Sequence, residues 1–219
     1  MSLWRDYPAK LAEAVGCPAL IYDRKGHGRS PALTQPRTPR YLHEEAQALD
    51  HLIGKEKIRD FFLVGHSDGA SIALLYAALA NATPPRAILT EAAHLFVDGI
   101  TRAGIRAAVD AYGQGLRERL MRHHGEKTDT LFWNWAGSWL APSFDAFDIR
   151  EEAKRVSCPV FALQGTDDEY GSPAQIEAIR ACCRGPVETR FIPGARHEPH
   201  QQAFEETLAW MRGALLSLL

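Results

Sequence analysis

A serine between two glycines is the residue whose surroundings most directly indicate catalysis. Ser67 stands in the motif GHSDG at residues 65–69, after an apolar run at 61–64 and before an alanine- and leucine-rich segment at 70–80. The run predicts a buried strand, and the segment predicts a helix. A tight, strained turn between them would lift the serine hydroxyl out of the chain and would require small residues at both glycine positions. The motif therefore predicts a nucleophile at Ser67, with the backbone amide of Asp68 as a donor to an oxyanion.

His197 is the histidine best placed to be the base that a serine nucleophile needs. It follows a predicted strand at 189–192 through a short loop. That position puts it at the carboxyl edge of a parallel sheet, where Ser67 also emerges. His200 lies inside the predicted last helix, which favours a capping or surface role. His66 adjoins Ser67, and we expect it to pack in the substrate pocket rather than to ionise.

An acidic residue should hold the imidazole in one tautomer, and Asp168 is the preferred candidate. It follows a predicted strand at 160–163 and so reaches the same edge of the sheet. Two alternatives stay open. Asp167 is adjacent to Asp168, although it could simply cap the turn. Glu91 directly follows another predicted strand, at 86–90, and so also reaches this edge.

These residues must be positioned by the strands and helices that the sequence predicts, in which short apolar segments alternate with segments of helical periodicity. Apolar runs at 18–22, 61–64, 86–90, 160–163 and 189–192 predict strands, and most of them are separated by amphipathic helices. This alternation predicts an α/β fold, a mostly parallel sheet covered by helices on both faces. The stretch 97–155 reads as helical and irregular, with no convincing strand.

Composition excludes several classes of protein. Of 219 residues, 46% are hydrophobic and 24% charged, and the formal net charge is -2, so no basic surface for nucleic acid is expected. No apolar run approaches the roughly 20 residues that a membrane helix needs. Four cysteines without a CxxC motif predict reduced thiols, no zinc site and a cytoplasmic protein.

The order Ser67, Asp168, His197 resembles that of the α/β-hydrolase superfamily. Three further segments are similar to its loops: GHGRS at 26–30, GTDD at 165–168 and GARH at 194–197. The serine carboxylesterase-like branch, often labelled pimeloyl-carrier-protein methyl ester esterases, is the most similar. The resemblance implies a core formed by residues 1–96 and 156–219, and a helical cap at 97–155.

The resemblance also implies a catalytic triad of Ser67, Asp168 and His197, with no metal or other cofactor. The expected substrate is a small or medium apolar ester. Aromatic residues in the cap are expected to line its pocket, namely Phe132, Trp133, Trp135 and Trp139. A carbon–carbon bond hydrolase, a thioesterase or a lactonase would carry the same triad.

One departure from the family concerns the N-terminus. The family begins with further strands, one of which ends in a His-Gly segment that supplies a second oxyanion amide, and this sequence starts after that segment. That strand would lie between the segments 18–22 and 61–64, so we expect a gap or an unusual direct pairing there. An exposed sheet edge could pair with a second copy, which predicts a homodimer. Loss of an oxyanion donor leaves a non-catalytic ligand-binding protein as an alternative.

Overall fold

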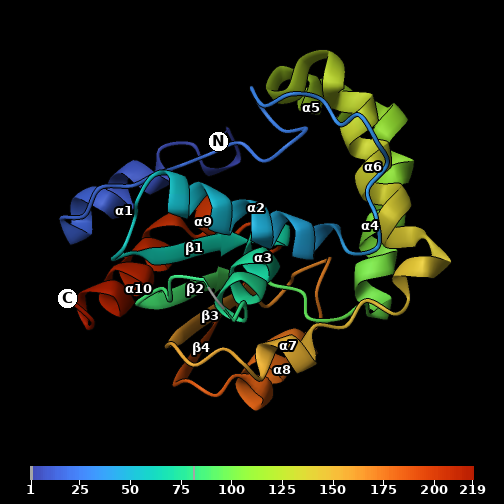
Figure 1. The fold of residues 1–219 in the computed structure, drawn as a ribbon. Helices are drawn as coiled ribbons and strands as arrows, with labels where there is room; N and C mark the ends of the chain where they lie inside the picture. The colour runs from blue at the N-terminus through green and yellow to red at the C-terminus, as the bar shows by residue number, and fades with distance from the viewer. Residues whose placement is uncertain (1, 81) are drawn as a thin grey trace.

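The computed structural model describes residues 2–80 and 82–219. Its sheet is parallel and contains four strands in the order β1-β2-β3-β4 (Figure 1). The strands are β1 (Phe62–His66), β2 (Ala87–Glu91), β3 (Val160–Gly165) and β4 (Val187–Ile192). Four of the five predicted strands are therefore confirmed, and the fold belongs to the predicted α/β class.

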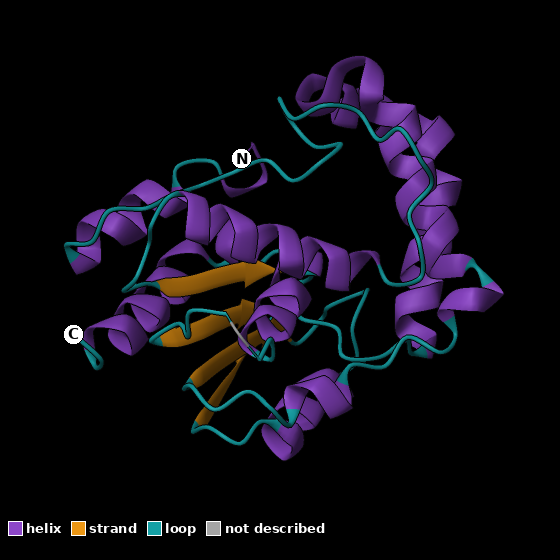
Figure 2. Ribbon diagram, viewed as in Figure 1, coloured by secondary structure: helices purple, strands orange, loops and turns teal. Residues whose placement is uncertain are grey.

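Helices cover both faces of the sheet, as Figure 2 shows. Those outside the segment between β2 and β3 are η1 (Ser2–Trp4), α1 (Tyr7–Val15), α2 (Tyr41–Lys55), α3 (Asp68–Ala77), α8 (Ala174–Cys182), α9 (Pro199–Gln202) and α10 (Phe204–Leu216). Helices α2, α3 and α8 contribute to one buried apolar cluster, and α1 and α10 contribute to another.

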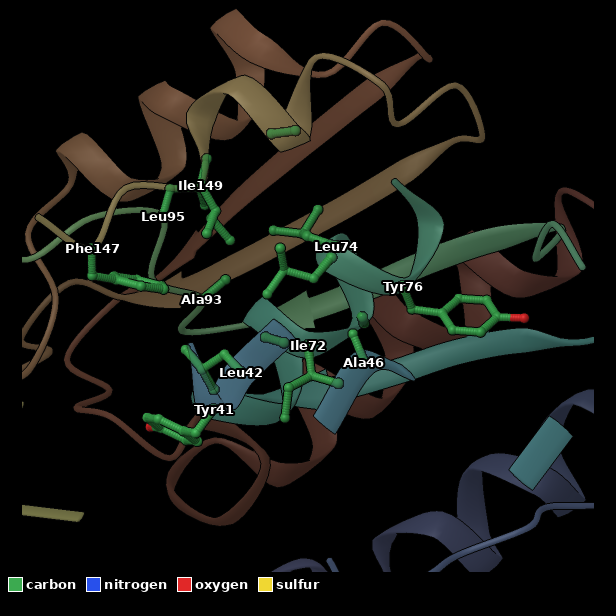
Figure 3. Close-up of a cluster of buried hydrophobic side chains, with 14 of the residues drawn as sticks. Tyr41, Leu42, Ala46, Ile72, Leu74, Tyr76, Ala93, Leu95, Phe147 and Ile149 are labelled. Atoms are coloured by element: carbon green, nitrogen blue, oxygen red, sulfur yellow. The ribbon is translucent and has the colours of Figure 1, made fainter. Parts of the chain in front are cut away.

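The side-chain alternation of the central strands explains the two clusters. Ile88 and Ala162 belong to the cluster with α2 and α3, whereas Leu89 and Leu163 belong to the cluster with α1 and α10. Successive side chains of a strand point to opposite faces, so a strand buried on both faces needs a continuous apolar run. Figure 3 shows part of the first cluster, where side chains from α2 and α3 meet Leu95 and Ile149.

The register of the strands brings their carboxyl ends to one edge. His66 lies opposite Glu91, and Gly165 lies opposite Ile192. The motif with Ser67 and the loops with Asp168 and His197 follow these strand ends directly. In Figure 1 the strand arrows point toward the upright group of helices that contains α4 and α6.

The prediction of a strand at 18–22 is wrong. This segment forms no strand, and its Leu20 is 57% exposed. An apolar run becomes a strand only if its backbone finds a ladder partner. Here the segment pairs with no strand, and its Leu20 and Ile21 line the same cavity as Leu63 and Val64 of β1. Of the two outcomes expected for this region, the described residues have the gap and not the direct pairing.

The segment between β2 and β3 is helical, and its elements are α4 (Gly99–Ala111), η2 (Tyr112–Leu116), α5 (Arg117–His124), η3 (Gly125–Lys127), α6 (Thr128–Leu140), η4 (Pro142–Phe144) and α7 (Arg150–Ala153). Its start is tied to the core through Asp98, which caps α4 by accepting from Thr101 N at 2.8 Å. The other carboxylate oxygen of Asp98 accepts from Ser172 N at 3.2 Å. Within the helix, a Cβ added at Gly104 would lie 2.2 Å from the carbonyl oxygen of Glu169. Helix α4 and the loop after β3 are therefore in direct backbone contact.

Across residues 2–80 and 82–219, we find no helix with the length and apolar character that crossing a bilayer requires.

Candidate active site

Ser67 occupies a strained turn between β1 and α3. Its φ of 53° and ψ of -121° are unusual for a residue with a side chain, and its N–H donates to the carbonyl of Glu91 at 2.8 Å. A Cβ at Gly65 would lie 2.3 Å from the carbonyl oxygen of Gly69, so only glycine fits there. A Cβ at Gly69 would meet nothing within 4 Å. The expectation that both positions must be small therefore holds for the first glycine and not for the second.

The structure brings Ser67, His197 and Asp168 together in one hydrogen-bonded row. Nε2 of His197 lies 3.0 Å from Ser67 Oγ, and Nδ1 lies 2.8 Å from Asp168 Oδ1. The carboxylate can only accept, so Nδ1 carries a proton and donates it to Asp168. In a neutral imidazole, Nε2 is then free to accept from the serine hydroxyl.

Asp168 is buried and well supplied with donors. Oδ1 accepts from the backbone N–H of Tyr170 at 2.9 Å, and Oδ2 accepts from the Gln164 side-chain amide at 3.1 Å. Burial alone would raise the pKa of Asp168. The hydrogen bond from His197 and the electrostatic attraction of the same ring outweigh burial and lower the pKa. The carboxylate is thus held in its charged form, in which it can orient the imidazole.

Gly165 allows the loops that carry Asp168 and His197 to touch. A Cβ at this position would lie 2.1 Å from the carbonyl oxygen of Ala195. Asp167 N donates to that same oxygen at 2.9 Å. A larger residue at the end of β3 would therefore push the two loops apart.

Neither alternative acid is placed against the His197 ring. Asp167 is exposed, and its Oδ1 accepts from the Thr166 hydroxyl at 3.1 Å. Glu91 lies in the interior, where its Oε1 accepts from Nδ1 of His200 at 2.8 Å. His200 is only 1% exposed, so its expected surface role is not what the structure shows.

Two further histidines flank His197, and both favour the neutral form. His66 donates from Nε2 to the His197 carbonyl at 2.8 Å, and His94 donates from Nε2 to the Tyr170 carbonyl at 2.8 Å. Burial and the nearby His197 hold the pKa of each ring below its ordinary value. His94 follows β2 directly, and its part in this site had no signal in the sequence.

Asp68 presents its backbone amide and its carboxylate to different partners. It is the first residue of α3, where a backbone N–H has no acceptor within the helix. Its Oδ2 accepts from the Tyr41 hydroxyl at 2.9 Å and from both Nη atoms of Arg24 at 3.4 Å. Arg37 approaches the same oxygen. Sequence reasoning missed these three partners, because each is far from Asp68 along the chain.

A cavity of about 940 Å³ opens beside Ser67 and His197. Four of the predicted pocket residues line it: His66, Phe132, Trp135 and Trp139. Trp133 does not line it and is 50% exposed. Successive residues of a helix point in different directions, so Phe132 and Trp133 cannot both face the cavity.

One group of side chains in the described residues has the composition of a metal site. Ligand atoms of His66, Glu91 and His200 lie within 4.8 Å of one another. His66 already donates to a carbonyl, and Glu91 and His200 already bind each other. We therefore describe this group as a hydrogen-bond network.

Solved structures of known proteins share this fold. A monoacylglycerol lipase from Paleococcus ferrophilus is similar in structure, with a TM-score of 0.70 and 19% identity over 100% of this chain and 90% of that chain. An esterase from Rhodococcus sp. ECU1013 has a TM-score of 0.70 and 18% identity over 99% and 86% of the two chains. A proline iminopeptidase from Mycobacterium smegmatis has a TM-score of 0.65 and 17% identity over 99% and 86%. At such identities the likeness concerns the fold.

Sequence comparison provides the family. No curated protein matches the sequence. A family model described as the alpha/beta hydrolase family matches residues 1–210, which is most of the chain. This chain therefore belongs to the alpha/beta hydrolase family.

Proposed function

We propose that this protein is a serine hydrolase that cleaves a small or medium carboxylic ester through an acyl-enzyme. The observation that carries the proposal is the row formed by Ser67 Oγ, the His197 imidazole and the Asp168 carboxylate, with contacts of 3.0 and 2.8 Å. A serine hydroxyl becomes a strong nucleophile when such a base removes its proton during attack.

In the acylation half of the reaction, Ser67 Oγ attacks the ester carbonyl carbon while His197 Nε2 takes the hydroxyl proton. The carbonyl oxygen becomes an oxyanion, and the Asp68 N–H donates to it at the N-terminus of α3. Asp168 stabilises the imidazolium. As the tetrahedral intermediate collapses, the carbon–oxygen bond of the ester breaks, and His197 returns the proton to the leaving alcohol.

In the deacylation half, a water molecule takes the place of the alcohol. His197 removes a proton from this water as its oxygen attacks the acyl carbon. The second tetrahedral intermediate expels Ser67 Oγ, which receives the proton from His197. The products are a carboxylic acid and an alcohol, and the serine is regenerated.

We further propose that the helices of residues 97–155 form a cap that shapes the substrate pocket. Phe132, Trp135 and Trp139 line the cavity from α6 and offer an apolar surface for an acyl or alcohol group. Esters, thioesters, lactones and activated carbon–carbon bonds could all be attacked by this serine, and we propose esters among them. We place the activity in the cytoplasm, a proposal supported by four cysteines that form no disulfide.

The direct test is labelling with a fluorophosphonate probe, which reacts with activated serines. We expect the wild-type protein to be labelled, His197→Ala to be labelled much more slowly and Ser67→Ala to remain unlabelled. Ser157→Ala is a matched control, because this serine is exposed and lies outside the cavity. A folded wild-type protein that takes no label would contradict the proposal and favour a non-catalytic ligand-binding role.

A further inference from the structure

Arg37 has a buried guanidinium that is not fully hydrogen-bonded. Its side chain is only 4% exposed, and Nη1 lies 3.7 Å from Asp68 Oδ2. Nη2 is buried and has no hydrogen-bond partner within the described part of the chain. Burial of a charged donor without an acceptor is unfavourable, and such groups usually find a partner. The orphaned nitrogen therefore indicates an acceptor that comes from outside the chain.

The position of Arg37 is fixed from two sides. Its backbone N–H donates to Asn134 Oδ1 on α6 at 2.9 Å. Its guanidinium carbon lies 4.5 Å from the centre of the Tyr41 ring, on α2. A guanidinium held in this way loses little conformational freedom when it binds a ligand.

Arg24 adds a second positive charge at the same point. Both of its Nη atoms lie 3.4 Å from the Asp68 oxygen that Arg37 approaches. Among the described residues, Asp68 has the only carboxylate within ion-pair distance of either arginine. Glu45 lies farther off in the field of both arginines, and burial raises its pKa above the ordinary value. Within ion-pair distance, two guanidinium groups therefore share a single carboxylate.

This cluster lies inside the cavity and next to the nucleophile. Arg24, Arg37 and Asp68 all line the cavity that Ser67 and His197 line. Asp68 is adjacent to Ser67 in sequence, so the arginines meet the residue next to the nucleophile. A substrate without an acceptor at this point would leave the Arg37 nitrogen unpaired.

We infer that Arg24 and Arg37 bind a carboxylate carried by the substrate, so that the protein acts on anionic esters such as monoesters of dicarboxylic acids. Guanidinium groups match the planar carboxylate with paired donors, which makes this the ligand chemistry that the cluster fits. The inference rests on the proposed function, because it assigns a substrate class to the same site. The competing explanation is structural, with both arginines serving only to hold Asp68.

Binding to Ser67→Ala protein separates the two explanations without any turnover. The probes are adipic acid monoamide, which has one carboxylate, and adipamide, its neutral counterpart, and the measurement is calorimetry. We expect the monoamide to bind at least about tenfold more tightly than adipamide, and added Arg37→Gln to remove most of the difference. Adding Arg37→Lys, which keeps the charge but not the paired donors, should retain part of it.

Kinetics give the corresponding measurement on the active protein. The substrates are the 4-nitrophenyl monoester of adipic acid and the same ester with a carboxamide in place of the carboxylate. For a carboxylate on the alcohol side, the pair is 4-acetoxybutanoate and 4-acetoxybutanamide. We expect kcat/KM to favour the charged member of at least one pair by about tenfold, and the preference to fall with added salt. Arg184→Gln is the matched control, since Arg184 is exposed and lies outside the cavity.

The outcomes distinguish this inference from the proposed function. Equal binding of both probes by Ser67→Ala, or a preference that survives Arg37→Gln, overturns the carboxylate site whether or not the protein is a hydrolase. If Arg37→Gln lowers kcat/KM equally for charged and neutral esters, the arginines act structurally and the inference fails. Preferential binding of the monoamide by a protein that the fluorophosphonate does not label would support the carboxylate site and reject the hydrolase.

Discussion

Glu91 and His200 form an ion pair in which both side chains are fully buried, with 2.8 Å between Oε1 and Nδ1. Nε2 of His200 faces the carbonyl oxygen of Leu3 at 3.3 Å, so both ring nitrogens point at acceptors. Burial opposes the charged imidazole, but the hydrogen bond and charge of Glu91 outweigh it and raise the pKa of His200. The pair links the end of β2 to α9, three residues beyond His197.

Removing one member of this pair should destabilise the fold. In Glu91→Gln the His200 cation loses its counterion in the interior, and we expect the free energy of unfolding to fall by about 3 kcal/mol. Urea unfolding measures the change. Glu151→Gln is the control, because its pair with Lys154 is exposed and should contribute well under about 1 kcal/mol. Equal stability of the two variants would mean that the buried pair is not charged.

The buried neutral histidines should make stability depend on pH. His94 has a pKa lowered by burial and by His197, so the unfolded chain binds a proton more readily than the folded chain does. Its contribution to stability is therefore present above the unfolded pKa of about 6.5 and is lost as the pH falls through the folded pKa. In His94→Gln we expect the decline in unfolding free energy from about pH 6.5 to 5 to be shallower by up to about 1.4 kcal/mol per pH unit. Parallel pH profiles for variant and wild type would contradict this.

The two neighbouring aspartates after β3 should differ greatly in their effect on turnover. Asp168 bonds to the His197 ring, so Asp168→Asn should favour the wrong tautomer and reduce kcat by about a thousandfold or more. Asp167 bonds to Thr166 instead, and Asp167→Asn should change kcat by less than about twofold. Steady-state hydrolysis of a neutral 4-nitrophenyl ester provides the measurement. A similar loss in both variants would remove Asp168 from its proposed role.

The two glycines of the GHSDG motif should respond differently to a methyl group. Gly65→Ala would place a Cβ against the Gly69 backbone, and we expect a loss of unfolding free energy of about 3 kcal/mol or more. Gly69→Ala meets open space inside α3 and should be as stable as the wild type or more stable by up to about 1 kcal/mol. Thermal and urea unfolding of the two variants provide the comparison, and equal losses would show that Gly69 also needs to be small.

The sequence was sufficient to predict the features that depend on local pattern. Strand, turn and helix around Ser67 follow from an apolar run, a glycine-bounded serine and an alanine-rich segment, and all three are present. Asp168 and His197 were predicted from their positions after strands, because parallel strands end at one edge. The position after a strand predicts the same edge for Glu91. The sequence does not show that the Glu91 carboxylate binds His200 and not His197.

What the sequence could not provide depends on partners distant along the chain. The run at 18–22 is apolar enough for a strand, but a strand also needs a neighbour for its backbone, and no pattern within the run reports one. Arg24, Arg37 and Tyr41 converge on Asp68 from separate segments, so none of them stands near the motif in the sequence. Phe132 and Trp133 are neighbouring aromatic residues, and only the direction in which each side chain leaves the helix makes the first buried and the second exposed.

The contact at Gly104 joins α4 to the segment that carries Asp168. Gly104 of α4 contacts the backbone of Glu169, and Asp98 accepts a hydrogen bond from Ser172. Because of these two contacts, the first turns of α4 cannot move outward unless the segment that carries Asp168 moves with them. Any movement of the helices around the cavity would then have to occur beyond this contact. A kink at Gly115, whose φ is 99°, separates α4 from α5. We therefore expect the helices beyond the kink to move more easily than the segment that carries Asp168.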